Sequence, residues 1–474
     1  MTTVNLRETD MTLETRNTGA EIVERVAKAR ASFRSGRTRP VSWRRSQLQA
    51  LKRLLKEEES AIFEALWADL RKPPLEGYLT EVGFVIAEID DALQHLDRWM
   101  KPERTHTSLL AQPGKSWTTH DPLGVVLVIG TWNYPVQLLL APLVGALAGG
   151  NAAVLKPSEI AAHTSALLAA LVPRYLDPEA VAVIQGGADE TQALLEERFD
   201  LIFFTGGSRV GQIVLEKAAT HLTPVVLELG GKSPCLVDRD ASLEVAARRI
   251  AWGRFSNAGQ TCVAPDYVLV HEAVELELLA HLRAAVAAFY GDDPRTSPDY
   301  GRIVNDRNFE RLSKLLRDGE VVCGGRADAK ERYIAPTILR GVSPEAPVMR
   351  EEIFGPILPV LTVPSMDAAI EFVADRPSPL ALYLFSNDEA TQREVVDRTS
   401  SGNACINDVI MHMVVPELPF GGVGESGMGR YHGRWSFETF THRKGVLARS
   451  IHLDLPVRYP PYSDGHLALL KLID

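Results

Sequence analysis

The strongest candidate for chemistry is a single cysteine near the middle of the chain. Cys262 lies in residues 256–265, whose sequence is SNAGQTCVAP. Small and polar neighbours leave a thiol uncrowded and surrounded by backbone amides, and a reactive cysteine needs access and surroundings that favour its thiolate. We therefore expect Cys262 to be a nucleophile with a favoured thiolate. The alternative is a partly buried loop cysteine without chemistry, and the other motifs must decide between the two.

Two further residues are suited to a reaction at such a thiol. Asn133 follows an apolar run over residues 125–129, and its side-chain amide can donate to an oxyanion without carrying charge. Glu228 lies inside another apolar strand. A carboxylate placed there must be paired, coordinated or raised in pKa, and a raised pKa is what a general base for water needs. The alternatives are a turn or capping asparagine and a salt-bridged glutamate.

Glycines and charges follow two more predicted strands. Gly206, Gly207 and Gly211 open a predicted helix, where backbone N–H groups and the helix N-terminus favour a pyrophosphate. Their spacing is not Gly-x-Gly-x-x-Gly, and a plain tight turn also requires glycine. Lys156 and Glu159 end another strand, at the sheet edge where ligands of open α/β folds bind. A lysine at a strand end can equally be a solvated charge.

The second half of the chain adds one more carboxylate and one more loop. Glu352 stands two residues before Phe354 and a Gly-Pro turn, and residues 419–430 are dense in glycine. Either segment can be simple turn chemistry. Three aromatic residues can line an apolar substrate tunnel or pack in the core: Trp132, Tyr134 and Trp252.

These residues need a scaffold, and the apolar pattern predicts one. Residues 48–66 carry leucine and isoleucine at helical spacing up to the prolines at 73 and 74. From about residue 123, short continuous apolar runs alternate with helical segments, which is typical of strands covered on both faces in a doubly wound parallel sheet. A second alternating series runs from about residue 234 to 406 and predicts a second α/β domain. Residues 136–155 predict a buried helix, a turn and a strand rather than a membrane span.

Two segments lie outside both series. Residues 104–121 are polar and predict a projecting hairpin, and the stretch after residue 437 carries isolated apolar residues with Pro456, Pro460 and Pro461. That stretch shows no helical or strand period long enough to make a domain. Both segments are candidates for an interface.

Composition excludes several classes of protein. The 474 residues are 45% hydrophobic and 24% charged, with a net charge of −10 and scattered basic residues. These values are typical of a folded globular protein and argue against a nucleic-acid partner. The four cysteines lie far apart, so they predict no metal site and fit a reducing cytoplasm. Residues 1–10 lack the apolar centre of an export signal.

Together these motifs, in this order, resemble the NAD(P)-dependent aldehyde dehydrogenase superfamily across residues 20–463. The class 3 branch is indicated by four segments: Trp132-Asn133-Tyr134-Pro135, residues 259–267, residues 419–433, and Arg458-Tyr459-Pro460-Pro461-Tyr462. The resemblance implies a Rossmann-type cofactor domain, an α/β catalytic domain and a small oligomerisation element. Their expected ranges are 20–103 with 122–227 for the cofactor domain, 228–408 for the catalytic domain, and 104–121 with 437–474 for the oligomerisation element.

The resemblance also implies roles for the candidate residues. Cys262 would be the nucleophile, Asn133 the oxyanion donor and Glu228 the general base. Glu352 would clamp the nicotinamide ribose. The remaining expected contacts to NAD or NADP are Lys156 and Glu159 on the adenosine ribose, the turn glycines Gly206, Gly207 and Gly211, and Trp132 and Phe354.

The implied reaction is oxidation of medium-chain aliphatic or aromatic aldehydes to carboxylic acids through a cysteine thioester. The family branch further implies a homodimer. Two departures from the family pattern carry expectations of their own. Gly207 stands where many members have serine, which removes a hydroxyl but leaves backbone donors. The chain ends at Asp474 without the hydrophobic tail of the membrane-bound members, so we expect a soluble enzyme without a membrane anchor.

Three other functions compete with this one. A CoA-acylating dehydrogenase would pass the acyl group to CoA, and the buried Glu228 argues against it. A cysteine thioesterase or esterase would use the same thiol without redox chemistry, and its activity would need no NAD(P). An idle scaffold on the same fold would have no reason to keep Cys262, Glu228 and Asn133 together.

Overall fold

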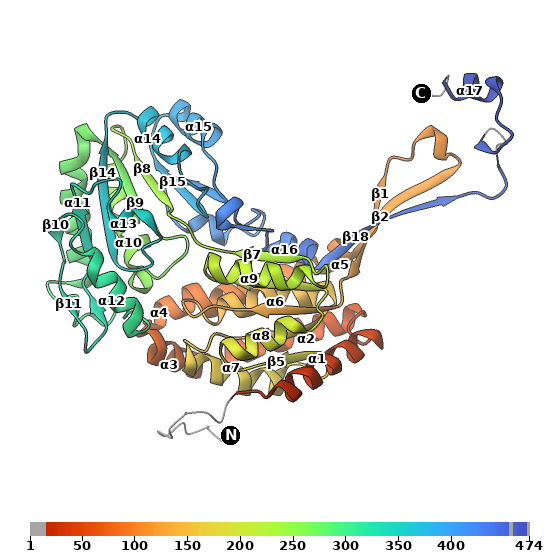
Figure 1. Cartoon of the computed structure of the whole chain (residues 1–474), viewed down its shortest axis with the longest axis horizontal. Coiled ribbons are helices and arrows are strands. Elements are labelled where there is room, and N and C mark those ends of the chain that lie inside the picture. The colour runs from red at the N-terminus through yellow and green to blue at the C-terminus, as the bar shows by residue number, and fades with distance from the viewer. Residues whose placement is uncertain (1–15, 455–457, 472–474) are drawn as a thin grey trace.

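The computed structural model describes residues 16–454 and 458–471, and two large β-sheets form its body (Figure 1). The first sheet contains, in spatial order, β17 (Gly427–Met428), β7 (Val225–Glu228), β6 (Leu201–Thr205), β3 (Val125–Ile129), β4 (Ala152–Lys156) and β5 (Val181–Val183). All neighbours are parallel except β17, which is antiparallel to β7. The parallel sheet with helical crossovers confirms the predicted fold class.

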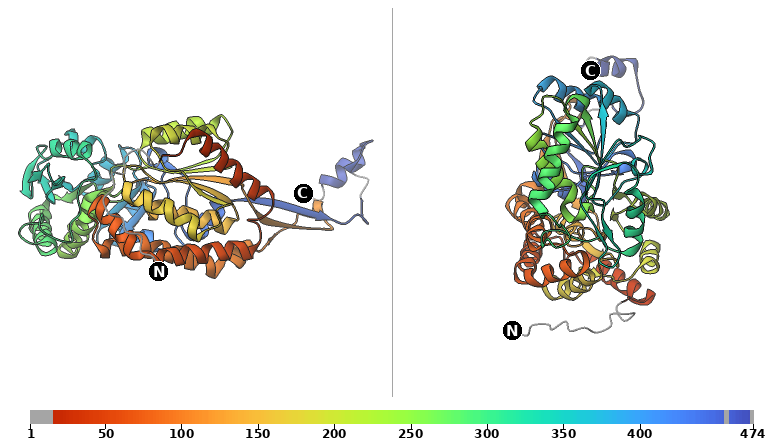
Figure 2. Two further views of the ribbon diagram at one scale, coloured as in Figure 1. Left: turned by 90° about the horizontal axis from the view of Figure 1, so that it is seen from below. Right: turned by 90° about the vertical axis from the view of Figure 1, so that its left-hand side faces the viewer.

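Helices cover both faces of this sheet (Figure 2). One face carries α1 (Gly19–Arg34), α8 (Ala188–Glu196) and α9 (Ser208–Ala219). The other face carries α6 (Gln137–Gly149) and α7 (Ala162–Tyr175), with α2 (Val41–Glu57), α3 (Glu59–Leu70), α5 (Gly83–Met100) and α16 (Gly433–Thr439) packed outside them. The single early helical region of the sequence is therefore two helices, α2 and α3.

The continuous apolar runs follow from this two-sided covering. In β3, Val125, Leu127 and Ile129 pack into the core beneath α1, whereas Val126 and Val128 pack beneath α6. Neither face meets water, so no polar alternation appears. Helix α6 is buried on every side, which explains its membrane-like composition, and it ends at Gly150 in the left-handed conformation (φ 82°).

The second sheet contains, in spatial order, β10 (Glu320–Cys323), β13 (Thr337–Arg340), β14 (Ile357–Val363), β9 (Tyr267–His271), β8 (Pro234–Val237), β15 (Ala381–Phe385) and β16 (Asn403–Ile406). Only its edge strand β10 is antiparallel. Its longer helices are α10 (Leu243–Phe255), α11 (Glu275–Tyr290), α12 (Asp306–Leu315), α14 (Met366–Ala374) and α15 (Glu389–Arg398). This sheet corresponds to the second α/β series of the sequence.

A third sheet forms an arm that projects from the body (Figure 1). It joins β1 (Glu103–Thr105), β2 (Gly114–Pro122) and β18 (Thr441–Arg449), with β18 antiparallel to β2 along its whole length. The expected hairpin at 104–121 is thus present. The stretch after residue 437, in which the sequence shows no period long enough to make a domain, contributes strand β18. This strand is held by backbone pairing rather than by a buried face, so its side chains show no apolar period.

The remaining elements are short. They are α4 (Pro74–Gly77), η1 (Tyr78–Val82), η2 (Leu109–Ala111), η3 (Ser256–Gly259), η4 (Glu272–Val274), β11 (Ala327–Asp328), β12 (Tyr333–Ile334), α13 (Pro347–Arg350), η5 (Met411–Val414), η6 (Gly424–Ser426) and α17 (Asp464–Lys471). In the described part of the chain, no helix combines the length and the apolar character that crossing a membrane requires. Pro456 and the N-terminal residues 1–10, to which two sequence expectations refer, lie outside the described residues.

The sequence assigned residues 409–436 to no domain, and the structure shows where they go. Strand β17 joins the first sheet beside β7, with Gly427 opposite Glu228. Only glycine fits there, because its φ is 140° and a Cβ would lie 2.0 Å from the carbonyl oxygen of Leu227. The chain therefore returns to the first sheet after completing the second.

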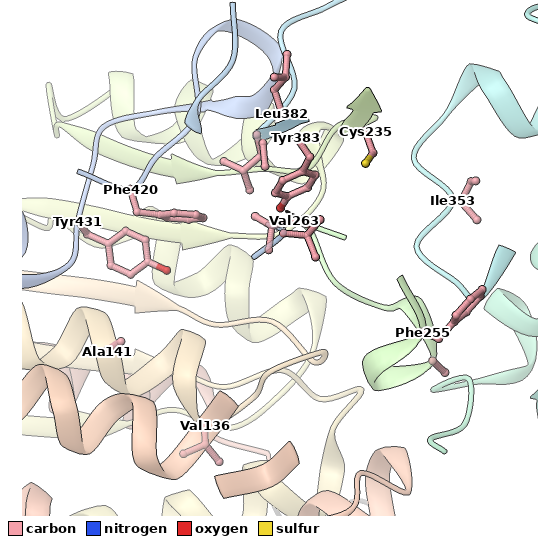
Figure 3. Packing of buried hydrophobic residues seen from close by; sticks show 14 of the residues in the cluster. Val136, Ala141, Cys235, Phe255, Val263, Ile353, Leu382, Tyr383, Phe420 and Tyr431 are labelled. Carbon is pink, nitrogen blue, oxygen red and sulfur yellow. Dashed lines mark hydrogen bonds between the residues drawn. The ribbon is translucent and has the colours of Figure 1, made fainter. Parts of the chain in front are cut away.

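One buried hydrophobic cluster spans both sheets (Figure 3). It includes Val136 and Ala141 below the first sheet and Tyr383 in the second. The Tyr383 hydroxyl donates to the carbonyl of Val263. The residue directly after Cys262 is therefore fixed by the core between the two sheets.

Candidate active site

Cys262 lies in a tight loop between α10 and β9, and its side chain is half-buried. The loop enters through Asn257 and Ala258, both in the left-handed region with φ of 51°. Each such residue costs on the order of 1–3 kcal/mol, and strain of this kind collects at functional sites because the surrounding structure enforces it.

The side chain of Gln260 enforces this loop conformation. Its amide nitrogen donates to the carbonyls of Asn257 (3.0 Å) and Arg302 (2.9 Å). Its amide oxygen accepts from the backbone N–H of Val304 (2.9 Å). A buried amide with three partners ties the loop that carries Cys262 to a second segment of the chain, so the position of the thiol is fixed by the fold itself.

The surroundings of Cys262 differ from the expectation in one respect. Its own backbone N–H and that of Val263 lower the thiol pKa, as the small neighbours suggested. Burial, followed by the charges of Glu352 and Glu228, outweighs them and raises the pKa of Cys262 to about 12. The expectation of a favoured thiolate is therefore wrong for the protein alone. The sequence showed the amides but not the carboxylates that the fold brings near the thiol.

Asn133 lies in the loop between β3 and α6, and it contacts the nucleophile loop directly. Its side-chain nitrogen donates to the carbonyl of Gln260 (3.1 Å), and its own carbonyl accepts from the side chain of Asn257 (2.9 Å). The next residue adds a bond between Tyr134 and Thr261 (2.6 Å between oxygens). Tyr134 is buried in this contact, so it packs the two loops together rather than lining an open tunnel.

Glu228 is the last residue of β7 and is 3% exposed. Neither of its carboxylate oxygens has a hydrogen-bond partner among the residues that the structure describes. Burial raises its pKa well above the ordinary value of 4.5. Of the outcomes considered for this residue, pairing is excluded within the described chain and a raised pKa is observed, as a general base for water requires.

The carboxyl edge of the first sheet carries Lys156 and Glu159. Lys156 ends β4, is buried, and donates to the carbonyl of Pro157 (2.8 Å), with its ammonium 3.5 Å from the carboxylate of Glu159. Burial lowers the pKa of Lys156 and the charge of Glu159 opposes this. Glu159 is half-exposed, so it presents a carboxylate to a ligand at this edge.

The glycine turn lies between β6 and α9. Gly207 caps the helix, is exposed, and has open space where a Cβ would lie. Gly206 and Gly211 have no such space, because a Cβ would lie 2.5 Å from the ring of Phe204 and 2.9 Å from Leu229 respectively. Glycine is therefore needed at the three positions for different reasons. Gly206 and Gly211 allow close packing, whereas Gly207 leaves the N-terminus of α9 open to an anion.

Glu352 approaches the same edge from the second sheet. A Cβ at Gly230 would lie 2.0 Å from a carboxylate oxygen of Glu352, which also accepts from the backbone of Gly231. Its other oxygen is buried without a partner in the described chain. Burial and then the charge of Asp266 raise the pKa of Glu352 to about 8. The ring of Phe354, in the left-handed conformation, stands edge-on to Trp132 with centroids 5.3 Å apart.

Two backbone hydrogen bonds link neighbouring segments that carry predicted site residues. The backbone N–H of Gly206 donates to the carbonyl of Glu228 (3.0 Å), and that of Gly130 to the carbonyl of Lys156 (3.0 Å). The first bond joins the glycine turn to the end of β7, which carries Glu228, and the second joins the end of β4, which carries Lys156, to the segment that leads to Asn133. The unpartnered acceptors of Glu228 and Glu352, the open N-terminus of α9 and the buried ammonium together fit a dinucleotide with hydroxyl donors and a pyrophosphate. No grouping of side chains suited to a metal ion occurs in residues 16–454 and 458–471.

Sequence reasoning missed two contributors to this site. Gly230 gives Glu352 its close approach, and a buried pair formed by Lys72 and Glu81 contacts the Asn133 loop. The paired glycines after Glu228 were visible in the sequence, but Glu352, which packs against Gly230, lies over a hundred residues away. Lys72, directly before two prolines, and Glu81, in a partly apolar stretch, carry no local signal in the sequence that marks them as buried.

Comparison with known proteins adds independent evidence. The sequence profile described as the aldehyde dehydrogenase family matches residues 5–446. A dimeric NADP-preferring aldehyde dehydrogenase of Mus musculus is 51% identical over 438 residues, covering 92% of this chain and 97% of the relative. Aldehyde dehydrogenase family 3 member B1 of Homo sapiens is 51% identical over 445 residues, covering 94% and 95%. A substrate-bound Staphylococcus aureus AldH structure superposes with a TM-score of 0.93 at 46% identity, covering 95% and 99%.

Proposed function

The chain belongs to the aldehyde dehydrogenase family, and we propose that it performs the family's NAD(P)-dependent oxidation of aldehydes through a thioester on Cys262. The observation that carries this mechanism is Glu228: a wholly buried carboxyl without a partner in the described chain, whose charge acts on the Cys262 thiol. A dehydrogenase that ends in hydrolysis needs such a group to activate water.

In the proposed reaction, the Cys262 thiol first releases its proton to solvent water. The thiolate sulfur then bonds to the aldehyde carbon, and the electron pair of the broken carbonyl π bond moves to the oxygen, which becomes an oxyanion. The side-chain amide of Asn133 and the backbone N–H of Cys262 donate to this oxygen. When bound, NAD(P)+ supplies the two-electron oxidant that converts the adduct into a thioester. Glu228 then takes a proton from water, the resulting hydroxide attacks the thioester carbon, and the carbon–sulfur bond breaks to release the carboxylic acid and restore the cysteine.

The residues that would hold NAD(P) are those at the carboxyl edge of the first sheet. Lys156 and Glu159 are placed for the adenosine ribose, the N-terminus of α9 at Gly206 and Gly207 for the pyrophosphate, and Glu352 for the nicotinamide ribose. Gly211 supports the turn by close packing. Trp132 and Phe354 form the aromatic contact beside it.

The function is tested by following reduced nicotinamide absorbance with a panel of aldehydes. We propose medium-chain aliphatic or aromatic substrates, which suits Trp252, a 36% exposed aromatic residue in α10, ten positions before Cys262. Each aldehyde is run with NAD+ and NADP+, and with and without CoA. Reduction that needs no CoA and yields the free acid supports the proposal. Acyl-CoA as the product, or ester hydrolysis without any aldehyde oxidation, contradicts it.

Replacing Asn133 by alanine should lower kcat about 100-fold or more, because one preorganised oxyanion donor is lost. The matched control is N151A. Asn151 is an equally buried asparagine that bonds the backbone of Gly124, Ala146 and Phe440, away from the proposed chemistry. Steady-state turnover and thermal melting are measured for both. Wild-type turnover in N133A contradicts the assigned role, whereas N151A should lose stability and keep turnover.

We propose that two chains form a homodimer through the projecting arm. Its described surface carries exposed apolar side chains, including Leu109, Leu447 and Ile451, the last 89% exposed. Exposed large apolar side chains gathered on one projecting element favour an interaction site there. The mouse and rat relatives are named dimeric, which supports the same assembly here.

Light scattering after gel filtration should give twice the 52.1 kDa of one chain, about 104 kDa. The variant L447D/I451D places charges in the arm interface and should shift the protein toward monomer at low micromolar concentration. The control L222D changes a leucine that is 91% exposed on the body and should remain dimeric. A monomeric wild type, or a dimer that tolerates both arm charges, contradicts the proposal.

We also propose a cytoplasmic location. All four cysteines are free thiols in the structure, and the proposed nucleophile is one of them. A thiol nucleophile persists where disulfides are kept reduced.

A further inference from the structure

We propose that Lys72 and Glu81 are positioning residues, which act on the reaction by holding Asn133 in the place from which it donates to the oxyanion. The inference rests on the proposed function, because it needs Asn133 to be that donor. It goes further by assigning a task to a buried ion pair that belongs to neither sheet.

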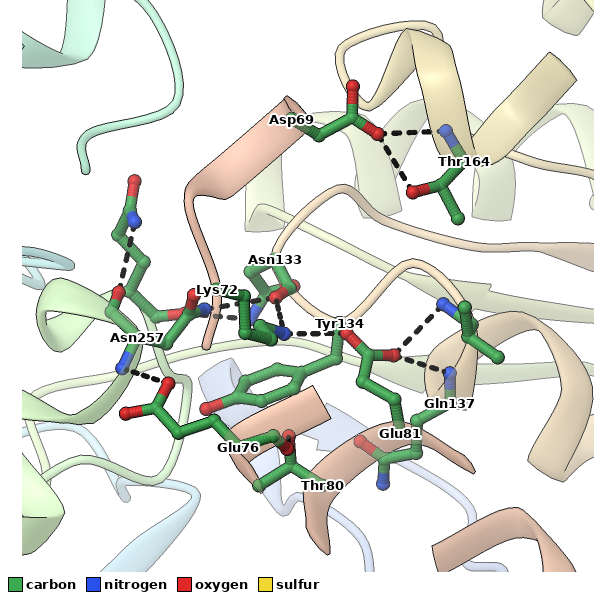
Figure 4. Close-up of polar contacts among 12 residues, drawn as sticks. Asp69, Lys72, Glu76, Thr80, Glu81, Asn133, Tyr134, Gln137, Thr164 and Asn257 are labelled. Atoms are coloured by element: carbon green, nitrogen blue, oxygen red, sulfur yellow. Dashed lines mark hydrogen bonds and ion pairs between the residues drawn. The ribbon is translucent and has the colours of Figure 1, made fainter. Parts of the chain in front are cut away.

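Lys72 reaches Asn133 from the end of α3. The helix ends at Arg71 in the left-handed conformation, and Pro73 and Pro74 follow, which turns the Lys72 side chain inward. This side chain is wholly buried. Its ammonium donates to the backbone carbonyl of Asn133 (2.9 Å) and to the carboxylate of Glu81 (2.5 Å), as Figure 4 shows. The loop bearing the oxyanion donor is thus held by a charged hydrogen bond.

Glu81 holds the other end of the same loop. It lies in the short π-helix η1, a form that appears often at functional sites. One carboxylate oxygen bonds Lys72, and the other accepts from the backbone N–H groups of Val136 (3.0 Å) and Gln137 (2.8 Å) at the start of α6. Burial raises the pKa of Glu81, while Lys72 and the two N–H donors favour its ionised form. The helix N-terminus adds to this preference for negative charge.

The pair therefore fixes both ends of residues 133–137, and the loop that carries Cys262 holds Asn133 and Tyr134 at the start of this segment. The carbonyl of Asn133 accepts from Lys72 on one side and from Asn257 on the other. One N–H of the Asn133 amide is taken by Gln260. Its second N–H has no acceptor in the described chain and is the donor left for the oxyanion. The ammonium of Lys72 also lies 4.0 Å from the centre of the Tyr134 ring, and this cation–π contact helps to hold the lysine side chain in place.

Stability alone does not explain a buried Lys–Glu pair at this position. Well-packed apolar residues of the same size stabilise a core as well as, or better than, a buried ion pair. A pair with four directional hydrogen bonds instead fixes geometry, and a misplacement of about 1 Å in a catalytic group costs roughly 100-fold in rate. The bonds of this pair all end on the loop of Asn133 or on each other.

The test is the double variant K72M/E81Q, which removes both charges together and leaves no unpaired one. We expect kcat to fall about 100-fold, with KM for aldehyde changed less than threefold. NAD(P)+ affinity and the rate of Cys262 alkylation by iodoacetamide should stay at wild-type values, because neither needs an oxyanion donor. The control D69N removes a carboxylate three residues before Lys72 that bonds only the start of α7. It should lower the melting temperature without lowering kcat.

Combining K72M/E81Q with N133A separates a positioning role from a merely structural one. If the pair acts through Asn133, the triple variant should be within about tenfold of N133A alone. Independent effects would multiply to roughly 10,000-fold, and that result overturns the inference, as does wild-type turnover in K72M/E81Q. Wild-type turnover in N133A itself is a different failure, because it removes the oxyanion role of Asn133 first.

A second variant covers the case in which K72M/E81Q does not fold. E81D keeps the charge but shortens the side chain by one methylene, so it cannot reach Lys72 and both N–H groups at once. We expect at least a tenfold loss of kcat with an unchanged circular dichroism spectrum. Full activity of E81D would overturn the inference.

Discussion

Replacing Cys262 by alanine should abolish aldehyde oxidation, with kcat lowered by at least about 10,000-fold. The loss is this large because the thiol forms and breaks the covalent bond in every cycle, and no neighbouring group can replace it. The charged side chains that act on the thiol are the carboxyls of Glu352 and Glu228, which are poorer nucleophiles toward a carbonyl. Turnover is followed by reduced nicotinamide absorbance.

The matched control is C405A. Cys405 is also half-buried and lies in strand β16 of the second sheet, so its replacement should leave turnover within threefold of wild type. Acid quenching of wild type during turnover should show an acyl mass on the peptide that contains Cys262. Oxidation that continues in C262A, or an acyl mass found on another peptide, would sink the thioester mechanism.

Replacing Glu228 by glutamine should allow oxidation to the thioester but block its hydrolysis, which lowers steady-state kcat about 1,000-fold. Glutamine keeps the shape of the side chain but cannot accept a proton from water. The first half of the reaction does not need that proton transfer, so a burst of reduced nicotinamide close to one per active site should precede the stall. Rapid mixing measures the burst, and mass spectrometry should find the thioester accumulated on Cys262.

The pH profile gives an independent check of the same residue. Glu228 accepts a proton from water only when ionised, and burial raises its pKa well above 4.5. Wild-type kcat should therefore rise with pH through that raised value. E228Q should lose this limb. Multiple turnovers at wild-type rate, or an unchanged pH limb in E228Q, would contradict the assignment.

The same pKa predicts a stability cost. Above pH 4.5 the unfolded chain releases the Glu228 proton, whereas the folded protein keeps it until its raised pKa is reached. In this window the folded state binds more protons, so its stability falls as pH rises. E228Q removes that dependence and should melt at a higher temperature than wild type at pH 8, with little difference at pH 4. Such a gain in stability with a loss of activity is common at functional sites.

Much of the fold could be predicted from local pattern. Strands such as β3 and β6 are unbroken apolar runs because both faces are covered, and helix α6 was distinguished from a membrane span by its glycines and Pro142. The residues at the strand ends followed from the rule that ligands bind at the carboxyl edge of an open sheet. Their functional roles came from the family resemblance, because the residue types and spacing alone were equally compatible with a purely structural role for each residue.

The rest could not be predicted because it depends on distant partners. Strand β17 has two residues and pairs with a strand about 200 positions earlier, so it leaves no period in the sequence. The arm strand β18 is mostly exposed and is fixed by backbone pairing. The raised pKa of Cys262 arises from burial and then from the charges of Glu352 and Glu228, neither of which is near it in sequence. Lys72 and Glu81 resemble surface charges until the fold encloses them.

The late return of the chain to its first sheet has a consequence for synthesis. As the polypeptide leaves the ribosome, the strands from β3 to β7 emerge long before residues 427–428, which pair beside Glu228. Strand β17, which lies next to the proposed base Glu228, is therefore missing until nearly the whole chain has been translated. Domains generally fold as they emerge, but a nascent chain of this protein carries Cys262 for well over a hundred codons before β17 can pair beside Glu228.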